Sequence, residues 1–135
     1  RLLDKCRGHI DFLWMGEDLG TQIAPLISLK LYRSTLKPIH RHFAQLARAY
    51  DIPAIIHTCG SSSWAYEDFI EIGIKGVDTL QPEAANMLPA YLAEHFGGRL
   101  KCRGYHFAPT HAIQDNSPTE NVLAMYQAAH DFGRY

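Results

Sequence analysis

The chain has 135 residues, of which 47% are hydrophobic and 20% are charged, a composition typical of one soluble globular domain. Its 13 basic and 14 acidic side chains give a net charge of −1 and form no basic run, which argues against nucleic acid as a partner. The longest uncharged stretch, residues 52–66, is shorter than the roughly 20 apolar residues of a membrane-spanning helix, so no membrane partner is expected.

Short apolar runs alternate with helical patterns along the chain, which is typical of βα units that build a parallel sheet. The predicted strands cover residues 10–15, 52–57, 76–80 and 100–108. The predicted helices cover about residues 25–35, residues 37–50 with Pro38 in the first turn, about residues 63–72 up to Gly73, a segment ending at Phe96 before Gly97, and a segment starting at Ser117. Residues 40–42 (HRH) are expected to face solvent. No linker or low-complexity tract interrupts the pattern, so residues 1–135 are treated as a single domain.

The three cysteines, Cys6, Cys59 and Cys102, are too few and too widely spaced to form a disulfide framework. An odd, sparse set is typical of a reducing compartment, where a cysteine with a special role acts as a metal ligand or a nucleophile. The chain opens at Arg1 without the basic and apolar segments of a secretory leader. These features predict a cytoplasmic protein, which could be a piece of a longer one.

Polar side chains follow each predicted strand. Because the carboxyl ends of parallel strands carry the ligand site in α/β folds, these residues are the first candidates for function. They are Glu17, Asp18 and Gln22 after the first strand, His57 and Cys59 after the second, Gln81 after the third, and His111 and Gln114 after the fourth. The strand interiors are mostly apolar, so the distribution is that of a binding site.

His57 and Cys59 form the sharpest pattern in this set. Residues i and i+2 of an extended strand point to the same side, so the imidazole and the thiolate can bind one cation. Zinc takes nitrogen and sulfur ligands together in a tetrahedral shell, and His111 is the candidate third ligand. The alternative is structural: a buried cysteine often acts as a small apolar residue, and a histidine at a strand end can bond a carbonyl.

Several short motifs occur in an order that resembles a known family. They are residues 16–22 (GEDLGTQ), 32–33 (YR), 37–38 (KP), 57–61 (HTCGS), 70–73 (IEIG), 107–114 (FAPTHAIQ) and 118–122 (PTENV). Together they resemble the carboxyl-terminal half of the uroporphyrinogen decarboxylase superfamily. The His-Xaa-Cys-Gly stretch is more similar to its zinc-dependent, corrinoid-linked methyltransferase branch than to the true decarboxylases.

This resemblance implies a partial (β/α)8 TIM barrel of about four βα units with a parallel sheet. It also implies a zinc ion held by His57, Cys59 and a third residue near the last strand. In the methyltransferases that third ligand is a cysteine, and His111 stands in its place here. The implied reaction is methyl transfer between a corrinoid, carried by a corrinoid protein, and a small-molecule thiol.

The roles of the remaining site residues are read from their positions after the predicted strands and fit the same reaction. Glu17 or Asp18 would act in catalysis, as a displaceable fourth ligand or as the partner of a ligand imidazole. The alternative for Asp18 is that it caps the next helix. Gln22, Gln81 and Gln114 would bind the substrate by hydrogen bonds, although loop glutamines often only face water.

The chain departs from the family in length. A full barrel takes about 250 residues, whereas the first half and one internal βα unit after Phe96 are missing here. Half a barrel leaves open sheet edges, so we expect a homo-oligomer or pairing with a complementary half-barrel chain. Two alternative functions follow: a non-catalytic fragment that needs such a partner, or uroporphyrinogen decarboxylase-type activity in porphyrin biosynthesis, for which this chain contains no catalytic residue.

Overall fold

The computed structural model of the chain describes residues 1–100, 119–120, 123–124 and 127. The chain divides into two compact units, Arg1–Cys102 and Arg103–Tyr135. In the second unit, the described residues are helical. Most of the predicted fourth strand, the Ser117 cap and the site candidates His111 and Gln114 lie outside the described residues.

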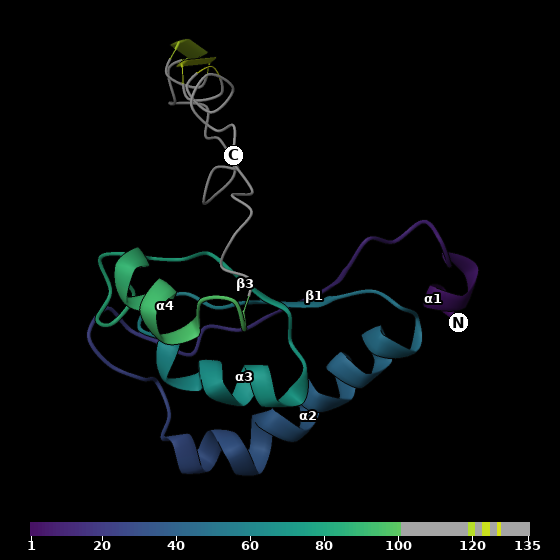
Figure 1. Cartoon of the computed structure of the whole chain (residues 1–135), viewed down its shortest axis with the longest axis horizontal. Coiled ribbons are helices and arrows are strands. Elements are labelled where there is room, and N and C mark those ends of the chain that lie inside the picture. The colour runs from purple at the N-terminus through teal and green to yellow at the C-terminus, as the bar shows by residue number, and fades with distance from the viewer. Residues whose placement is uncertain (101–118, 121–122, 125–126, 128–135) are drawn as a thin grey trace. The chain divides into compact units, whose positions relative to one another are not determined.

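The first unit alternates strands and helices (Figure 1). Its elements are α1 (Leu2–Lys5), β1 (Leu13–Gly16), α2 (Leu29–Ala49), β2 (Ala54–His57), the 3-10 helix η1 (Ser63–Ala65), α3 (Tyr66–Ile72), β3 (Gly76–Asp78) and α4 (Pro89–Phe96). The glycines that were predicted to end two helices do so: Gly73 follows α3 in the left-handed conformation, and Gly97 follows α4.

The three strands form one parallel sheet in the order β1-β2-β3. In its register, Gly16 pairs with His57, and His57 pairs with Asp78. Helices connect the consecutive strands, so the α/β class and the parallel sheet are confirmed, as a small open sheet within the described residues. The strands are shorter than the apolar runs that predicted them, and Pro53, which has no N–H to donate, lies just before the paired part of β2.

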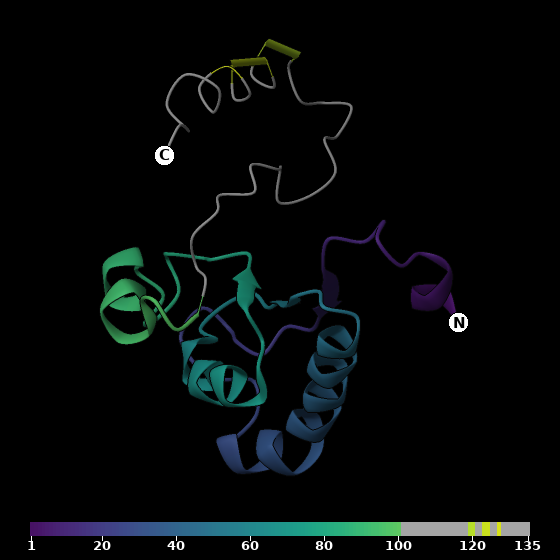
Figure 2. The same cartoon turned by 45° about the vertical axis from the view of Figure 1, so that its right-hand side comes forward.

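Helix α2 corrects the prediction of two helices separated near residue 36. It is one helix of 21 residues with Pro38 inside it, capped by the Ser28 hydroxyl, which accepts a bond from the amide of Leu31. A continuous buried face explains why the helix does not break at the proline; it contains Tyr32, Lys37, His40, Ala44 and Ala47. Pro38 cannot donate to the carbonyl of residue 34, and Figure 2 shows the helix axis changing direction along α2.

His40 lies on this buried face, so the expectation that residues 40–42 face solvent is wrong for His40. Its side chain is 2% exposed, whereas Arg41 and His42 are exposed as predicted. The Nδ1 atom of His40 lies 3.1 Å from the Tyr32 hydroxyl, and its Nε2 atom bonds the carboxylate of Glu17. These two polar partners make burial of the imidazole possible.

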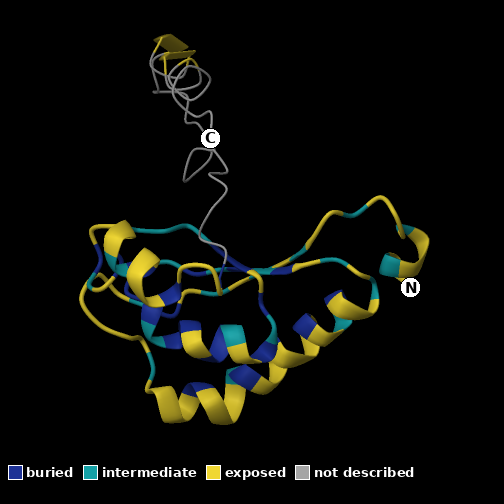
Figure 3. Ribbon diagram, in the orientation of Figure 1, coloured by how far each residue is buried: buried dark blue, intermediate teal, exposed yellow. Residues whose placement is uncertain are grey.

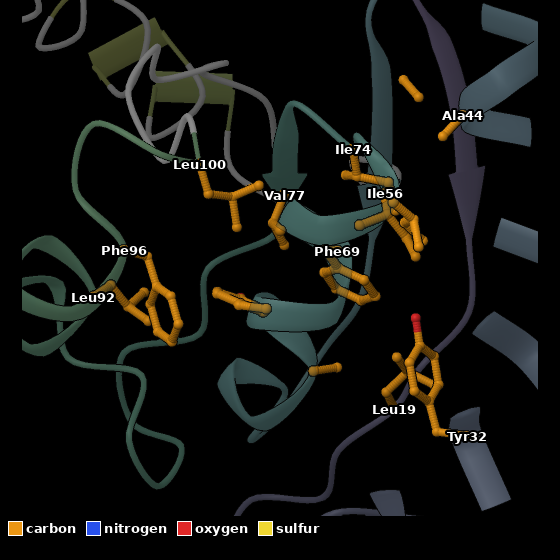
Figure 4. Packing of buried hydrophobic residues seen from close by; sticks show 14 of the residues in the cluster. Leu19, Tyr32, Ala44, Ile56, Phe69, Ile74, Val77, Leu92, Phe96 and Leu100 are labelled. Atoms are coloured by element: carbon orange, nitrogen blue, oxygen red, sulfur yellow. The ribbon is translucent and has the colours of Figure 1, made fainter. Parts of the chain in front are cut away.

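Helices α2 and α3 lie on the same side of the sheet (Figures 1 and 2) and enclose the core. Figure 3 shows that both helices combine a buried side with an exposed one. Ile56 of β2 and Phe69 of α3 have no exposed surface and lie close together in the core, with Tyr32 of α2 near them (Figure 4). In the part of the chain that the structure describes, the helices lack the combination of length and apolar character needed to cross a membrane.

Candidate metal centre

The loops that follow β1 and β2 cross in direct backbone contact. A Cβ atom added to Gly20 would lie 2.4 Å from the amide nitrogen of Ser61, and one added to Gly60 would lie 2.3 Å from the carbonyl oxygen of Gly20. The amide of Ser61 donates to the carbonyl of Thr21 at 2.7 Å across this crossing. Only glycine permits such an approach, and it brings the segment after β1 against the segment after β2.

We expect Gly60→Ala to destabilise the chain by about 3 kcal/mol. The alanine must adopt a left-handed backbone conformation, and its Cβ must displace the backbone of Gly20 and Thr21. Gly8→Ala is the matched control: Gly8 also has a positive φ, of +82°, but nothing lies within 4 Å of its added Cβ. Urea unfolding measures the free energy of unfolding of both variants. Gly8→Ala carries only the cost of the left-handed backbone, and the additional loss in Gly60→Ala is the cost of the steric clash. Equal destabilisation by the two substitutions would contradict the packing described above.

Asp18, His57 and Cys59 meet beside this crossing. The Nε2 atom of His57 lies 3.6 Å from the Sγ atom of Cys59 and 3.7 Å from an Oδ1 atom of Asp18. One ligand atom from each of the three residues lies within 4.8 Å of the others. The sequence prediction that His57 and Cys59 point to the same side of the chain is therefore confirmed, and Asp18 is the third member of the cluster.

These separations suit a zinc ion. Bond lengths of about 2.0–2.3 Å in a tetrahedral shell place neighbouring donor atoms about 3.3–3.6 Å apart, close to the two distances from His57 Nε2. The donor set of one imidazole nitrogen, one sulfur and one carboxylate oxygen is also the mixture that zinc accepts. The cluster is therefore a candidate zinc site.

Asp18 and Cys59 are joined directly. The amide of Cys59 donates to Oδ1 of Asp18 at 3.0 Å, which holds the exposed carboxylate over the cluster. Burial, together with the negative charge of Asp18, raises the pKa of the Cys59 thiol. Without a cation the thiol therefore keeps its proton at neutral pH, and a cation that binds the sulfur has to displace it.

The other nitrogen of His57 lies against the last residue of β3, Asp78, and the residue that follows it, Thr79. Nδ1 lies 3.0 Å from the Thr79 hydroxyl and 3.4 Å from Oδ2 of Asp78. Asp78 also accepts a bond from the indole nitrogen of Trp14 at 3.1 Å, and the Trp14 ring lies 5.7 Å from the His57 ring. Burial alone would raise the pKa of Asp78, but the bonds from Trp14, His57 and Thr79 outweigh it and lower that pKa.

The remaining predicted site residues are placed as follows. Glu17 bonds His40 through its side chain rather than joining the cluster, and its amide donates to the carbonyl of His57. Gln81 accepts a bond from the amide of Gly60 at 3.0 Å, so it fixes the loop that carries Cys59. Gln22 is exposed, and its carbonyl accepts from the amide of Ala85.

Sequence reasoning did not single out Asp78, Thr79 or Trp14 as site residues. Asp78 was a charged residue inside the predicted strand 76–80, and its pairing with His57 depends on the register of the sheet, which the sequence does not show. Comparison with known proteins adds no family to this picture: no family model, no curated protein and no solved structure matches the chain.

Proposed function

We propose that Asp18, His57 and Cys59 bind a zinc ion, and that the chain transfers a methyl group between a corrinoid and a small-molecule thiol. The observation that carries the proposal is the spacing of three different donor atoms, His57 Nε2, Cys59 Sγ and Asp18 Oδ1, which suits a tetrahedrally coordinated cation. The motif resemblance to corrinoid-linked methyltransferases supplies the reaction class. The proposal includes a cytoplasmic location and a sheet that is part of a (β/α)8 barrel.

Each residue has a defined task in this reaction. His57 and Cys59 hold the cation, and His111, the further ligand that the motif resemblance implies, lies outside the described residues. Asp18 is the ligand that a substrate displaces most easily, because its side chain is 57% exposed and lies on a loop. Gln22 and Gln114 are proposed to bind the substrate, and Gln81 acts by fixing the loop of Cys59.

A zinc ion at this position would lower the pKa of a substrate thiol and so supply a thiolate at neutral pH. The thiolate sulfur would then bond the methyl carbon carried by the corrinoid, and the electron pair of the broken cobalt–carbon bond would stay on the cobalt. The protein's contribution is to hold His57 and Cys59 together, with the more exposed carboxylate of Asp18 as the group that moves aside.

The proposal predicts that the chain demethylates methylcobalamin in the presence of a simple alkyl thiol. The reaction is measured by the change in the corrinoid absorption spectrum and by detection of the methyl thioether product. We expect Cys59→Ala to lower the rate by about 100-fold, because the cation loses its sulfur ligand. Cys6→Ala is the control, since Cys6 lies outside the cluster. Equal rates for the wild type and Cys59→Ala would rule the proposal out.

A second candidate function is a half-barrel that works only with a partner chain. It is favoured by the outer edge of β1, which has no strand partner among the described residues and where Phe12 and Trp14 are exposed. Sedimentation of the purified chain distinguishes the two candidates. A monodisperse monomer that demethylates methylcobalamin on its own excludes the need for a partner, whereas a homo-oligomer or an inactive aggregate favours it.

A further inference from the structure

Asp78 and Thr79 have no role in the function proposed above, yet both contact His57. Asp78 ends β3 and lies opposite His57 in the parallel ladder. Its carboxylate is half-exposed but is held on a second side by the indole of Trp14, which reaches over from β1. The imidazole of His57 is thus bordered by residues from both neighbouring strands.

Thr79 has an unusual backbone for its residue type. Its φ angle is +61°, in the left-handed region that a β-branched residue rarely adopts. This conformation places the Thr79 hydroxyl 3.0 Å from Nδ1 of His57 and 3.3 Å from Oδ1 of Asp78. Backbone strain of this kind persists where the surroundings impose it, often at functional sites.

The hydrogen bonds around Nδ1 have one consistent assignment. A carboxylate only accepts, so the single hydroxyl hydrogen of Thr79 is donated to Asp78. The hydroxyl oxygen of Thr79 must then accept a hydrogen bond from Nδ1 of His57. Oδ2 of Asp78, a second acceptor, lies 3.4 Å from the same nitrogen. His57 therefore carries its proton on Nδ1, and the lone pair of Nε2 points to Cys59 and Asp18.

We propose that Asp78 and Thr79 are the positioning residues of this site, which fix the Nδ1–H tautomer of His57 and aim its Nε2 atom at the cation. The positioning role rests on the proposed function, because it needs a cation at Nε2, but the tautomer of His57 is expected in the metal-free protein as well. A carboxylate or hydroxyl on the outer nitrogen of a ligand histidine fixes the ring and makes it a better ligand. Trp14 supports the arrangement by holding Asp78.

The first readout is the ¹⁵N NMR signature of His57 in the metal-free protein at about pH 8, where a free imidazole is neutral. We expect the Nδ1–H tautomer in the wild type. In Asp78→Asn the amide can donate as well as accept, so we expect a mixture of the two tautomers. The matched control Asp11→Asn changes an exposed carboxyl elsewhere and should leave the signature unchanged.

The second readout is zinc affinity, measured by competition with a chromophoric chelator. We expect Asp78→Asn to weaken it by about 10- to 100-fold, and Asp11→Asn to leave it unchanged. Thr79→Gly relieves the left-handed strain but removes the hydroxyl, so it should raise Tm while weakening zinc binding. If Thr79 had only a structural role, its substitution would change Tm and zinc affinity in the same direction.

The outcomes separate this inference from the proposed function. An Nε2–H tautomer in the wild type, or full zinc affinity in both Asp78→Asn and Thr79→Gly, overturns the positioning role even if zinc binds. If the wild type shows the Nδ1–H tautomer but binds no zinc, the metal centre is wrong and the positioning of His57 stands. The expected result is the Nδ1–H tautomer with zinc bound.

Discussion

Replacing Asp68 with asparagine is expected to lower the free energy of unfolding by about 3 kcal/mol, because it breaks a buried ion pair. Asp68 of α3 is 2% exposed, and its carboxylate accepts bonds from Lys37 at 2.5 Å and from Arg33 at 2.9 Å. Both cations lie on α2, so the contact joins the two helices that cover the sheet. The substitution removes the buried negative charge and leaves Lys37, itself buried, with the exposed carboxylate of Glu71 as its charged partner.

Glu67→Gln is the control for this prediction. Glu67 also lies on α3 and pairs with Arg99, but both side chains are about half-exposed. Its loss should lower the free energy of unfolding far less than Asp68→Asn does, because solvent screens an exposed pair. Urea unfolding measures the loss of free energy of unfolding in the two variants. Similar small losses for both would show that the buried pair does not hold α2 and α3 together.

The Asp68 contribution should depend on pH. Burial alone would raise the pKa of Asp68, but the bonds from Lys37 and Arg33 outweigh it, so its pKa in the folded chain lies below the ordinary value. A depressed carboxyl pKa contributes stability that is present above the unfolded pKa of about 3.9 and is lost as pH falls through the folded value. The stability difference between the wild type and Asp68→Asn should therefore be largest near neutral pH and shrink in acid.

Zinc should stabilise the folded chain, and this is the second large effect expected. A ligand that binds only the folded state at 100 times its Kd raises the free energy of unfolding by about 2.7 kcal/mol. Cys59→Ala should abolish most of this gain, because the cation loses its sulfur ligand. Magnesium, which prefers oxygen ligands, should have little effect on either protein. An equal response of the wild type and Cys59→Ala to zinc would place the binding elsewhere.

Local sequence patterns predicted the frame of the site because they depend on short-range rules. Apolar runs located the three strands of the described sheet, and Gly73 marked a helix end through its left-handed backbone. The two-residue period of an extended chain was enough to place His57 and Cys59 on one side. These inferences need no knowledge of which segments meet in space.

The partners of His57 could not be predicted in the same way, because they come from other parts of the chain. Asp18 reaches the cluster only because two loops cross at Gly20 and Gly60, a contact that no local pattern reveals. Asp78 depends on the register between β2 and β3. Likewise, the long helix α2 continues through Pro38 because its buried face outweighs the local preference of proline.

The most direct test of the account is the zinc content of protein dialysed against zinc-buffered solution and then passed over a desalting column. We expect one zinc ion per chain in the wild type and in the Cys6→Ala control. In His57→Ala and Cys59→Ala the content should fall to background, because each substitution removes a donor atom of the cluster. Equal zinc in all four proteins, or none in the wild type, would contradict a metal centre at Asp18, His57 and Cys59.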